Sequence, residues 1–371
     1  MPARPWSRAA DPVLWTGSTS APPRRRRRRE EDVKGSDRPL SEAYDVALLD
    51  LDGVVYVGRR PVPRAAEALA KARADGQRLA FVTNNASRTP AAVVALLAEV
   101  GVPAAPEDVV TSAQAAARLL AERLPAGAKV LVVGGTALRV ALYDRGLRPV
   151  SVAAERPAAV VQGFSPDLGY GLLAEGGKAV ARGALFVGSN GDATIPGEDG
   201  PPKPGNGALL RVIQAATGVE PIVTGKPEKP LHREAMLRTG AGRPLVVGDR
   251  LDTDIEGAHN GGADSLLVLT GVTGPLGLLT APPHQRPTYV AADLTGLLVP
   301  HPEVRRDGDA DRCGGWTARL RAPGDAVELD GAGDPLDGLR ALAAAAWRTE
   351  GTVRPEAVAE ALRRLGLPAG H

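Results

Sequence analysis

From Tyr44 onward, short apolar runs alternate with longer amphipathic runs. Residues 46–52 (VALLDLD) and 78–85 (RLAFVTNN) are apolar, have the length of strands and end in polar residues. Residues 63–76 and 89–101 have helical periodicity, and each run closes on a glycine. An order of strand, helix, strand, helix is typical of a parallel sheet covered by helices. We therefore expect an α/β fold with a doubly wound parallel-sheet core.

A second strand–helix series follows the first, and the first pattern then resumes at residue 222. A strand–helix unit placed inside another such unit predicts an inserted α/β cap domain. Near the C-terminus, two amphipathic helices are expected at 336–351 and 354–366, in a small extension outside the sheet. The predicted domains are a disordered basic tail (1–40), a discontinuous parallel-sheet core (41–112 and 222–300), an inserted cap (113–221) and a C-terminal accessory helical module (301–371).

Cysteine content and hydropathy indicate in which compartment the protein is expected and whether it associates with a membrane. The chain has 371 residues and one cysteine, Cys313, so it cannot form an internal disulfide framework. This fits a reducing compartment, and we expect a cytoplasmic protein. No run reaches the roughly 18 apolar residues that a membrane helix needs, so no membrane association is expected.

The positive charge lies in the N-terminal segment. Residues 1–40 carry ten basic and five acidic groups, a net charge of +5 in a chain whose total is +2. The rest of the chain therefore sums to −3, which argues against nucleic acid as a partner of the folded part. The arginine run 24–29 could bind nucleic acid or acidic membrane, but such runs are more often solvated tails.

Four apolar runs end in residues that can carry chemistry, where an open parallel sheet binds its ligands. Each residue alone would more often be a helix cap, a turn or a surface charge. Together, in this order, they predict one site. The four groups are Asp50, Asp52 and Gly53; Thr83, Asn84 and Asn85; Lys226; and Asp249, Asp252 and Asp254.

These residues stand in four motifs that resemble those of the haloacid dehalogenase superfamily. The motifs are DLDGVVYVG, FVTNNASRTP, GKPEKP and VVGDRLDTDIEGAHNGGA. The long gap between Asn85 and Lys226 is similar to the branch with a large α/β cap, which includes glycerol-phosphate, phosphoglycolate, pyridoxal-phosphate and 4-nitrophenyl-phosphate phosphatases. The resemblance covers about residues 41–300. The C-terminal piece looks like an extension found on actinobacterial glycerol-phosphate phosphatases of this branch.

The resemblance implies a metal-dependent mechanism. A phosphate monoester is a dianion, so attack by a carboxylate needs compensating positive charge, and Mg²⁺ prefers oxygen ligands. Asp50, Asp249 and the backbone carbonyl of Asp52 are the implied ligands, and Asp254 is implied to support them. Asp50 is the implied nucleophile that forms an aspartyl-phosphate. Asp52 is implied to protonate the leaving alkoxide and then to activate water.

Phosphate binding is implied for the remaining motif residues. Thr83 would offer a hydroxyl and Asn84 an amide to the phosphoryl oxygens, with backbone N–H groups of the turn at Asn85. Lys226 would supply a fixed positive charge and hold Asp50. Asp192 and other polar groups of the cap and of the second motif, Asn190 and Arg88, are candidates for contact with the rest of the substrate.

The expected function is Mg²⁺-dependent hydrolysis of a small phosphorylated metabolite, with glycerol 3-phosphate first. This preference comes from the C-terminal extension, by analogy only. Asn206 and Phe164 stand where relatives often carry other residues, so the substrate is less constrained than the chemistry. Alternatives are a phosphoglycolate, nucleotide or sugar-phosphate phosphatase, or a non-catalytic protein that binds a phosphorylated ligand. Caps of this branch can mediate dimers, so a homodimer is one option.

Overall fold

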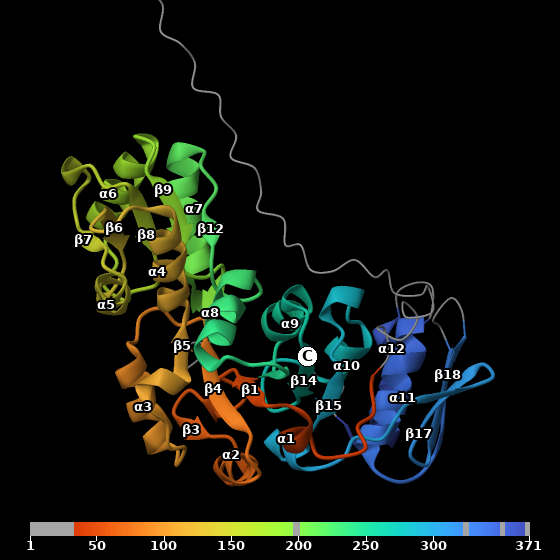
Figure 1. The fold of residues 1–371 in the computed structure, drawn as a ribbon. Coiled ribbons are helices and arrows are strands. Elements are labelled where there is room, and N and C mark those ends of the chain that lie inside the picture. The colour runs from red at the N-terminus through yellow and green to blue at the C-terminus, as the bar shows by residue number, and fades with distance from the viewer. Residues whose placement is uncertain (1–32, 196–200, 322–325, 349–352, 368–371) are drawn as a thin grey trace, which may run out of the picture. The chain divides into compact units, whose positions relative to one another are not determined.

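The computed structural model describes residues 33–195, 201–321, 326–348 and 353–367. Its core sheet is parallel throughout, in the order β15-β14-β13-β1-β4-β5 (Figure 1). The strands are β1 (Val46–Leu49), β4 (Arg78–Thr83), β5 (Val109–Thr111), β13 (Pro244–Gly248), β14 (Asp264–Val268) and β15 (Tyr289–Ala291). They are mostly apolar because helices cover both faces of the sheet.

Side chains of alternate strand residues point to opposite faces of the sheet. On β1, Ala47 and Leu49 join one hydrophobic cluster, whereas Val46 and Leu48 join another. The first cluster includes side chains of α1 (Leu40–Ala43), α2 (Ala65–Ala74), α3 (Pro90–Glu99) and η5 (Leu294–Leu298). The opposite face is covered by α4 (Ser112–Arg123), α8 (Lys229–Thr239), α9 (Glu256–Gly261) and α10 (Pro275–Leu279). The predicted doubly wound core is confirmed.

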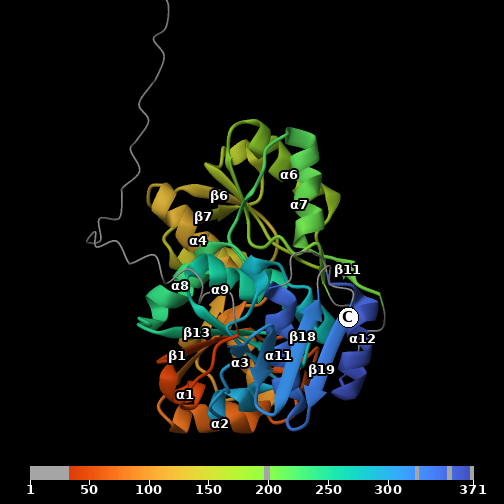
Figure 2. The same cartoon turned by 90° about the vertical axis from the view of Figure 1, so that its right-hand side faces the viewer.

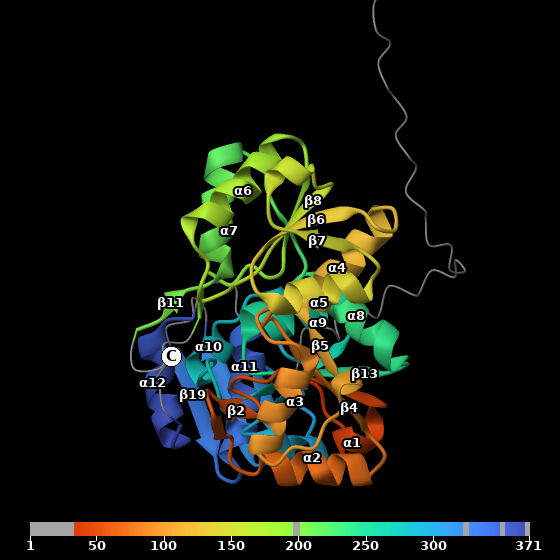
Figure 3. The ribbon, with the colours of Figure 1, turned by 90° about the vertical axis from the view of Figure 1, so that its left-hand side faces the viewer.

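A second parallel sheet forms the cap, in the order β12-β9-β8-β6-β7. Its strands are β6 (Lys129–Val133), β7 (Arg148–Val150), β8 (Ala159–Gln162), β9 (Leu185–Gly188) and β12 (Ile222–Val223). The helices α6 (Tyr170–Ala181) and α7 (Asn206–Thr217) pack together against one face (Figure 2). The other face is covered by α4 and α5 (Thr136–Asp144), as Figure 3 shows.

Short elements and turns connect these layers. Two antiparallel pairs are β2 (Tyr56–Val57) with β3 (Arg60–Pro61), and β10 (Thr194–Ile195) with β11 (Lys203–Pro204). One-turn helical segments are η1 (Pro106–Asp108), η2 (Ala153–Glu155), η3 (Leu251–Ile255, a π-helical turn) and η4 (Pro283–Gln285).

The strand before Lys226 belongs to the cap sheet, contrary to the prediction that the core pattern resumes at residue 222. Ile222 and Val223 of β12 pair with Val187 and Gly188 of β9. Lys226 is therefore not at the end of a core strand, and it lies in the loop that leads from β12 to α8. A two-residue apolar strand carries no local signal for which sheet it joins.

The C-terminal module contains a sheet that was not predicted. Its antiparallel strands are β16 (Arg305–Asp307), β17 (Ala310–Cys313), β18 (Trp316–Arg321) and β19 (Ala326–Gly331). The two predicted helices are present as α11 (Pro335–Arg348) and α12 (Pro355–Arg364). The prediction of an exclusively helical module was wrong. These strands are rich in Arg and Asp and alternate only weakly between polar and apolar residues, so their sequence gives little strand signal.

Helix α11 packs against the core sheet and its covering helix α10. Its side chains share one hydrophobic cluster with residues of β14, β15 and α10. Arg340 Nη2 donates a hydrogen bond of 2.6 Å to the backbone oxygen of Val290, and Trp347 Nε1 donates one of 3.0 Å to that of Leu278. The extension therefore completes the layer that covers the β14–β15 edge of the core sheet.

The end of the predicted basic tail is ordered. Residues 1–32 lie outside the described residues, but Val33 is buried, and Ser36 pairs with His301 in an isolated antiparallel bridge. The predicted disordered tail therefore extended too far along the chain, because residues 33–40 are ordered and lie along the core. In the described part of the chain, no helix is both long and apolar enough to span a bilayer.

Candidate active site

Three carboxylates meet at the carboxyl end of the core sheet. Asp50 follows β1 and Asp249 follows β13, and these strands are neighbours in the sheet. Asp254 comes from η3, one turn further along the chain. One oxygen of each residue lies within 4.8 Å of the others. Parallel pairing of the two strands explains why residues 199 positions apart in the sequence lie together at one end of the sheet.

Lys226 places a buried ammonium among these carboxylates. Its Nζ donates to Asp50 Oδ1, to Asp254 Oδ1 at 2.7 Å and to the backbone oxygen of Val82 at 3.1 Å. Burial acts to lower the pKa of Lys226, but the charges of Asp254 and Asp50 outweigh it and raise that pKa. The ammonium therefore stays protonated and has no unused donor.

One ammonium does not neutralise three carboxylates. Burial raises the pKa of Asp50, Lys226 opposes this, and Asp254 and Asp249 raise it further. Burial together with the charge of Asp254 raises the pKa of Asp249 to about 6. When all the groups are ionised, three negative charges face one positive charge, an excess of two. An excess of this size in a buried cluster favours binding of a divalent cation.

The surroundings of Asp249 fit such a cation. Asp249 Oδ2 accepts a hydrogen bond of 2.7 Å from the backbone N–H of Val272, whereas the buried Oδ1 has no hydrogen-bond partner among the described residues. A Cβ on Gly53 would lie 2.4 Å from Asp249 Oδ2, and one on Gly271 would lie 2.0 Å from it. The two glycines thus leave just enough room for this carboxylate, with one free oxygen that could bind a metal.

Asp52 lies outside the carboxylate cluster. Its side chain is exposed, and its Oδ1 accepts a hydrogen bond of 3.3 Å from the backbone N–H of Gly58. Between Asp50 and Asp52 the chain leaves the strand, and Gly53 has a φ of +85°, a conformation that favours glycine. Asp52 is therefore free of the ion pairs that immobilise Asp50. Its predicted metal contact would come from the backbone carbonyl alone.

The three polar residues after β4 differ in how far their side chains are engaged. Thr83 is buried, and its Oγ1 accepts from the backbone N–H of Asn85 at 3.1 Å, so its hydroxyl proton remains available. Asn85 Oδ1 accepts two hydrogen bonds of 2.8 Å from Ser87 and stabilises the turn. The side chain of Asn84 contacts Lys226 and the cap residue Asp192.

Sequence reasoning missed the segment after β14. Residues 269–274 (LTGVTG) follow a fifth core strand and supply the backbone N–H of Val272 that binds Asp249. Thr270 Oγ1 also donates a hydrogen bond of 2.5 Å to the backbone oxygen of Gly53. The signal was present, since this strand also ends in small and polar residues, but none of them is ionisable.

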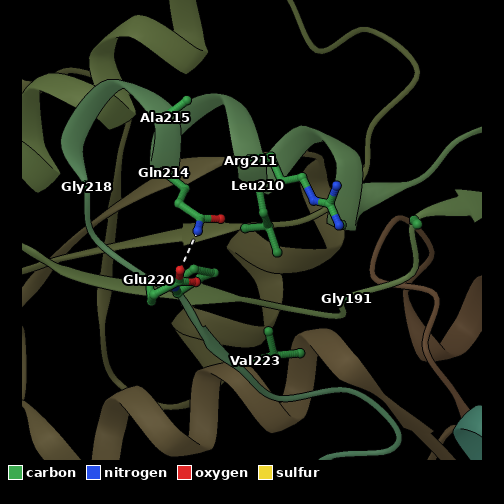
Figure 4. A pocket seen from close by; sticks show the side chains of 11 residues that line it. Gly191, Leu210, Arg211, Gln214, Ala215, Gly218, Glu220 and Val223 are labelled. Atoms are coloured by element: carbon green, nitrogen blue, oxygen red, sulfur yellow. Dashed lines mark hydrogen bonds between the residues drawn. The ribbon is translucent and has the colours of Figure 1, made fainter.

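A groove of about 700 Å³ lies elsewhere, in the cap between α7 and β12 (Figure 4). Gln214 donates a hydrogen bond to Glu220 across it, and its lining includes Leu210, Arg211 and Val223. The lining shares no residue with the carboxylate cluster. Chemistry is therefore assigned to the cluster, where ionisable groups converge, and not to this groove.

Three family models match the chain. One described as haloacid dehalogenase-like hydrolase matches residues 47–148, and one described as HAD-hydrolase-like matches residues 223–297. A model of a GCN5-related N-acetyltransferase-like domain matches residues 313–367, within the C-terminal module. The two hydrolase matches contain all the residues of the carboxylate cluster and Lys226.

Characterised relatives cover most of the chain. It is 44% identical over 318 residues to a D-glycerol 3-phosphate phosphatase of Mycobacterium tuberculosis, an alignment covering 84% of this chain and 88% of that relative. It is 39% identical over 234 residues to a 5′-nucleotidase of Bacillus subtilis, covering 62% of this chain and 90% of that relative.

Solved structures agree in fold. The crystal structure of a glycerol phosphate phosphatase from Mycobacterium tuberculosis in complex with magnesium matches with a TM-score of 0.79 and 42% identity, over 89% of this chain and 100% of that chain. A p-nitrophenyl phosphatase from Archaeoglobus fulgidus matches with a TM-score of 0.64 and 30% identity, over 69% of this chain and 98% of that chain. The chain belongs to the haloacid dehalogenase-like hydrolases.

Proposed function

We propose that this protein is a Mg²⁺-dependent phosphatase that hydrolyses a small phosphomonoester through an aspartyl-phosphate on Asp50. The observation that carries the proposal is the position of Asp50, which is held by Lys226 beside two further carboxylates. A nucleophile fixed in this way can attack phosphorus without first ordering its own side chain.

In the first step, an oxygen of Asp50 attacks phosphorus, and the bond from phosphorus to the leaving alkoxide breaks. Asp52 gives its proton to that alkoxide. In the second step, Asp52 takes a proton from water, the water oxygen attacks phosphorus, and inorganic phosphate leaves as the Asp50 carboxylate is restored. The exposure of Asp52 supports this role, because a group that exchanges protons with substrate and water must reach both.

The cation would be held by Asp50 and Asp249, with Asp254 beside them and the backbone carbonyl of Asp52 as a further ligand. When bound, Mg²⁺ supplies the positive charge that reduces repulsion between the attacking carboxylate and the phosphate dianion. Thr83 would donate its hydroxyl proton to a phosphoryl oxygen. Lys226 orients Asp50 and offsets negative charge that develops in the transition state.

Glycerol 3-phosphate is the proposed substrate. The match to the D-glycerol 3-phosphate phosphatase covers 84% of the 371 residues, about 312, so it extends past residue 300 wherever it begins. The match to the 5′-nucleotidase covers 62%, or about 230 residues. The likeness to the glycerol-phosphate enzyme therefore reaches into the C-terminal module. Phosphoglycolate, nucleotides and sugar phosphates are the alternatives.

The reaction is proposed to take place in the cytoplasm, because a phosphorylated metabolite is its substrate and Cys313, the single cysteine, is free and buried. Nucleic acid is not proposed as a partner, since the net positive charge lies in residues 1–40. A homodimer formed through the cap is the assembly to test by light scattering.

Phosphate release from a panel of esters tests the function. The panel contains glycerol 3-phosphate, phosphoglycolate, AMP and glucose 6-phosphate, each assayed with Mg²⁺ and with EDTA. Wild type should act best on glycerol 3-phosphate and lose activity in EDTA. Asp50→Asn keeps the size of the side chain but removes the nucleophile, and should be inactive. Glu175→Gln, a change within the cap, should leave the rate unchanged.

Two outcomes would overturn the proposal. Wild-type protein that binds these esters without hydrolysing any of them would be a phospho-ligand-binding protein. A folded D50N protein with wild-type turnover would exclude the covalent mechanism. Circular dichroism of D50N separates loss of the nucleophile from loss of the fold.

A further inference from the structure

The side-chain amide of Asn84 forms two hydrogen bonds with the backbone of Lys226. Its Oδ1 accepts a hydrogen bond of 2.7 Å from the backbone N–H of Lys226, and its Nδ2 donates one of 3.1 Å to the backbone oxygen of the same residue. Gly225 lies so close that a Cβ there would stand 2.6 Å from Asn84 Oδ1. The side-chain amide of Asn84 is therefore engaged by protein and not directed at a phosphoryl group.

These two hydrogen bonds position a lysine that lies in a loop after a strand of the cap sheet. The residue follows β12 of the cap sheet, so the chain does not enter it from a strand of the core sheet. Its Nζ reaches the backbone oxygen of Val82 in β4, while Asn84 at the end of β4 holds its backbone. Both ends of the lysine are thus positioned from one core strand.

The cap in turn holds Asn84. Asp192 accepts from Asn84 Nδ2, with distances of 3.1 Å to Oδ1 and 3.3 Å to Oδ2. Asn190 Nδ2 donates a hydrogen bond of 2.7 Å to the backbone oxygen of Asn84. These are contacts between the loop after β9 in the cap and the loop after β4 in the core.

Asp192 is itself fixed on its own side. Its backbone N–H donates to Asn190 Oδ1 at 3.2 Å, and its backbone oxygen accepts from the N–H of Gly207 at 2.8 Å. Asn206, at the start of α7, is buried and donates a hydrogen bond of 2.8 Å to the backbone oxygen of Asn190. A Cβ on Gly205 would lie 2.2 Å from the backbone oxygen of Asp192, so the backbone of this loop packs closely against the start of α7.

We propose that Asp192 is a positioning residue of the cap that acts through Asn84 to set the position of Lys226. The inference rests on the proposed phosphatase function and deepens it. In this arrangement the Asp192 carboxylate orients the Asn84 amide so that its oxygen faces the N–H of Lys226. The reversed amide would set Nδ2 against that N–H and Oδ1 against the negative carboxylate. Asp192 thereby links the position of the cap to the ammonium that holds Asp50.

Enzyme kinetics with two substrates separates positioning from direct contact with substrate. Asp192→Ala should lower kcat roughly 10- to 100-fold, the usual loss when a residue that orients a catalytic group is removed, with a smaller change in KM. The factor should be the same for glycerol 3-phosphate and 4-nitrophenyl phosphate, because Lys226 faces the shared phosphoryl group. Asp192→Asn should recover most of the rate, since its amide oxygen can still accept from Asn84.

A double-mutant cycle tests the route through Asn84. If Asp192 acts through that residue, N84A/D192A should be no slower than N84A alone. Glu175→Ala is the matched control, since among the described residues this cap carboxylate accepts hydrogen bonds only from Ala153 and Lys178, within the cap. It should leave kcat unchanged.

Three results would overturn the inference: a D192A loss confined to KM for glycerol 3-phosphate, losses that multiply in the double variant, or D192A with wild-type kcat. Thermal melting of each variant accompanies the assays. Should D192A not fold, Asp192→Glu replaces it, because the longer side chain misplaces the carboxylate while keeping its charge. Inactive wild type would contradict the proposed function itself, a result distinct from active wild type with an unaffected variant.

Discussion

Lys226 Nζ donates a hydrogen bond of 2.7 Å to Asp254 Oδ1 and also bonds Asp50 Oδ1, so one ammonium bridges two carboxylates 204 positions apart. The lysine is 4% exposed and Asp254 is 1% exposed, so water does little to screen the pair. The arrangement both stabilises the buried charges and fixes the direction of the Asp50 side chain.

Replacing Lys226 by Met should lower kcat about 10²- to 10³-fold, the loss seen when one preorganised charge-stabilising group is removed. The methionine fills similar space but leaves Asp50 without its hydrogen bond. Steady-state kinetics on glycerol 3-phosphate measures the effect. Lys229→Met, an exposed lysine at the start of α8, is the control and should keep wild-type kcat. Near-normal turnover of K226M would show that Asp50 needs no ammonium.

Gly53→Ala should raise the Mg²⁺ concentration needed for half-maximal activity by at least about tenfold. Its Cβ would stand 2.4 Å from Asp249 Oδ2 and would push that carboxylate from its position. Gly58→Ala is a matched control, because Gly58 also has positive φ, +63°, but nothing lies within 4 Å of its Cβ. Both variants carry backbone strain, so only the difference between them reports on Asp249.

Leu342→Ala in α11 should lower the free energy of unfolding by about 2–5 kcal/mol, as for other fully buried leucines. Leu342 belongs to the hydrophobic cluster that includes Leu267 of β14, so we expect one transition for core and module in urea denaturation. Leu336→Ala, at a partly buried position, should cost less. A separate early transition for the module would contradict a shared core.

The contribution of His232 to the stability of the protein should fall as the pH decreases from about 6.5 to about 4. His232 is buried, its Nε2 has no hydrogen-bond partner among the described residues, and burial lowers its pKa to about 4. In this window the unfolded chain binds a proton at this histidine and the folded chain does not. The loss from His232 is roughly 3 kcal/mol when complete.

Urea denaturation at pH 8 and pH 5 checks this dependence. Gln at position 232 cannot be protonated, so the unfolding free energy at pH 8 minus that at pH 5 should be lower in the His232→Gln variant than in wild type. His259→Gln, at an exposed position, is the control. An unchanged difference in H232Q would assign the pH dependence to other groups.

Much of the fold followed from local patterns. Apolar runs such as Val46–Leu49 and Arg78–Thr83 became neighbouring parallel strands, and the runs between them became the helices that cover the sheet. Local patterns did not predict the sheet that β12 joins or the strands β16–β19, because these strands are short or weakly patterned. Which sheet such a strand joins depends on the partner that lies beside it, and that partner is distant in the sequence.

The residues of the candidate site were predicted from the sequence, but not all of their contacts were. Asp50, Asp249, Asp254 and Lys226 were predicted together from their places in the motifs, and the structure brings them together. Asn84 was expected to face phosphate, but its amide holds the backbone of Lys226, 142 positions away. The orientation of an amide follows from the donors and acceptors around it, which a sequence does not show.

The sequence by itself determined the strand–helix order and the residue types that end the strands, because hydrophobic periodicity and chain reversal are local properties. The tertiary structure alone decided that a loop from the cap sheet delivers Lys226, that Asp192 reaches Asn84, and that α11 covers the core. These features depend on hydrogen bonds and buried contacts between segments that meet only when the chain is folded.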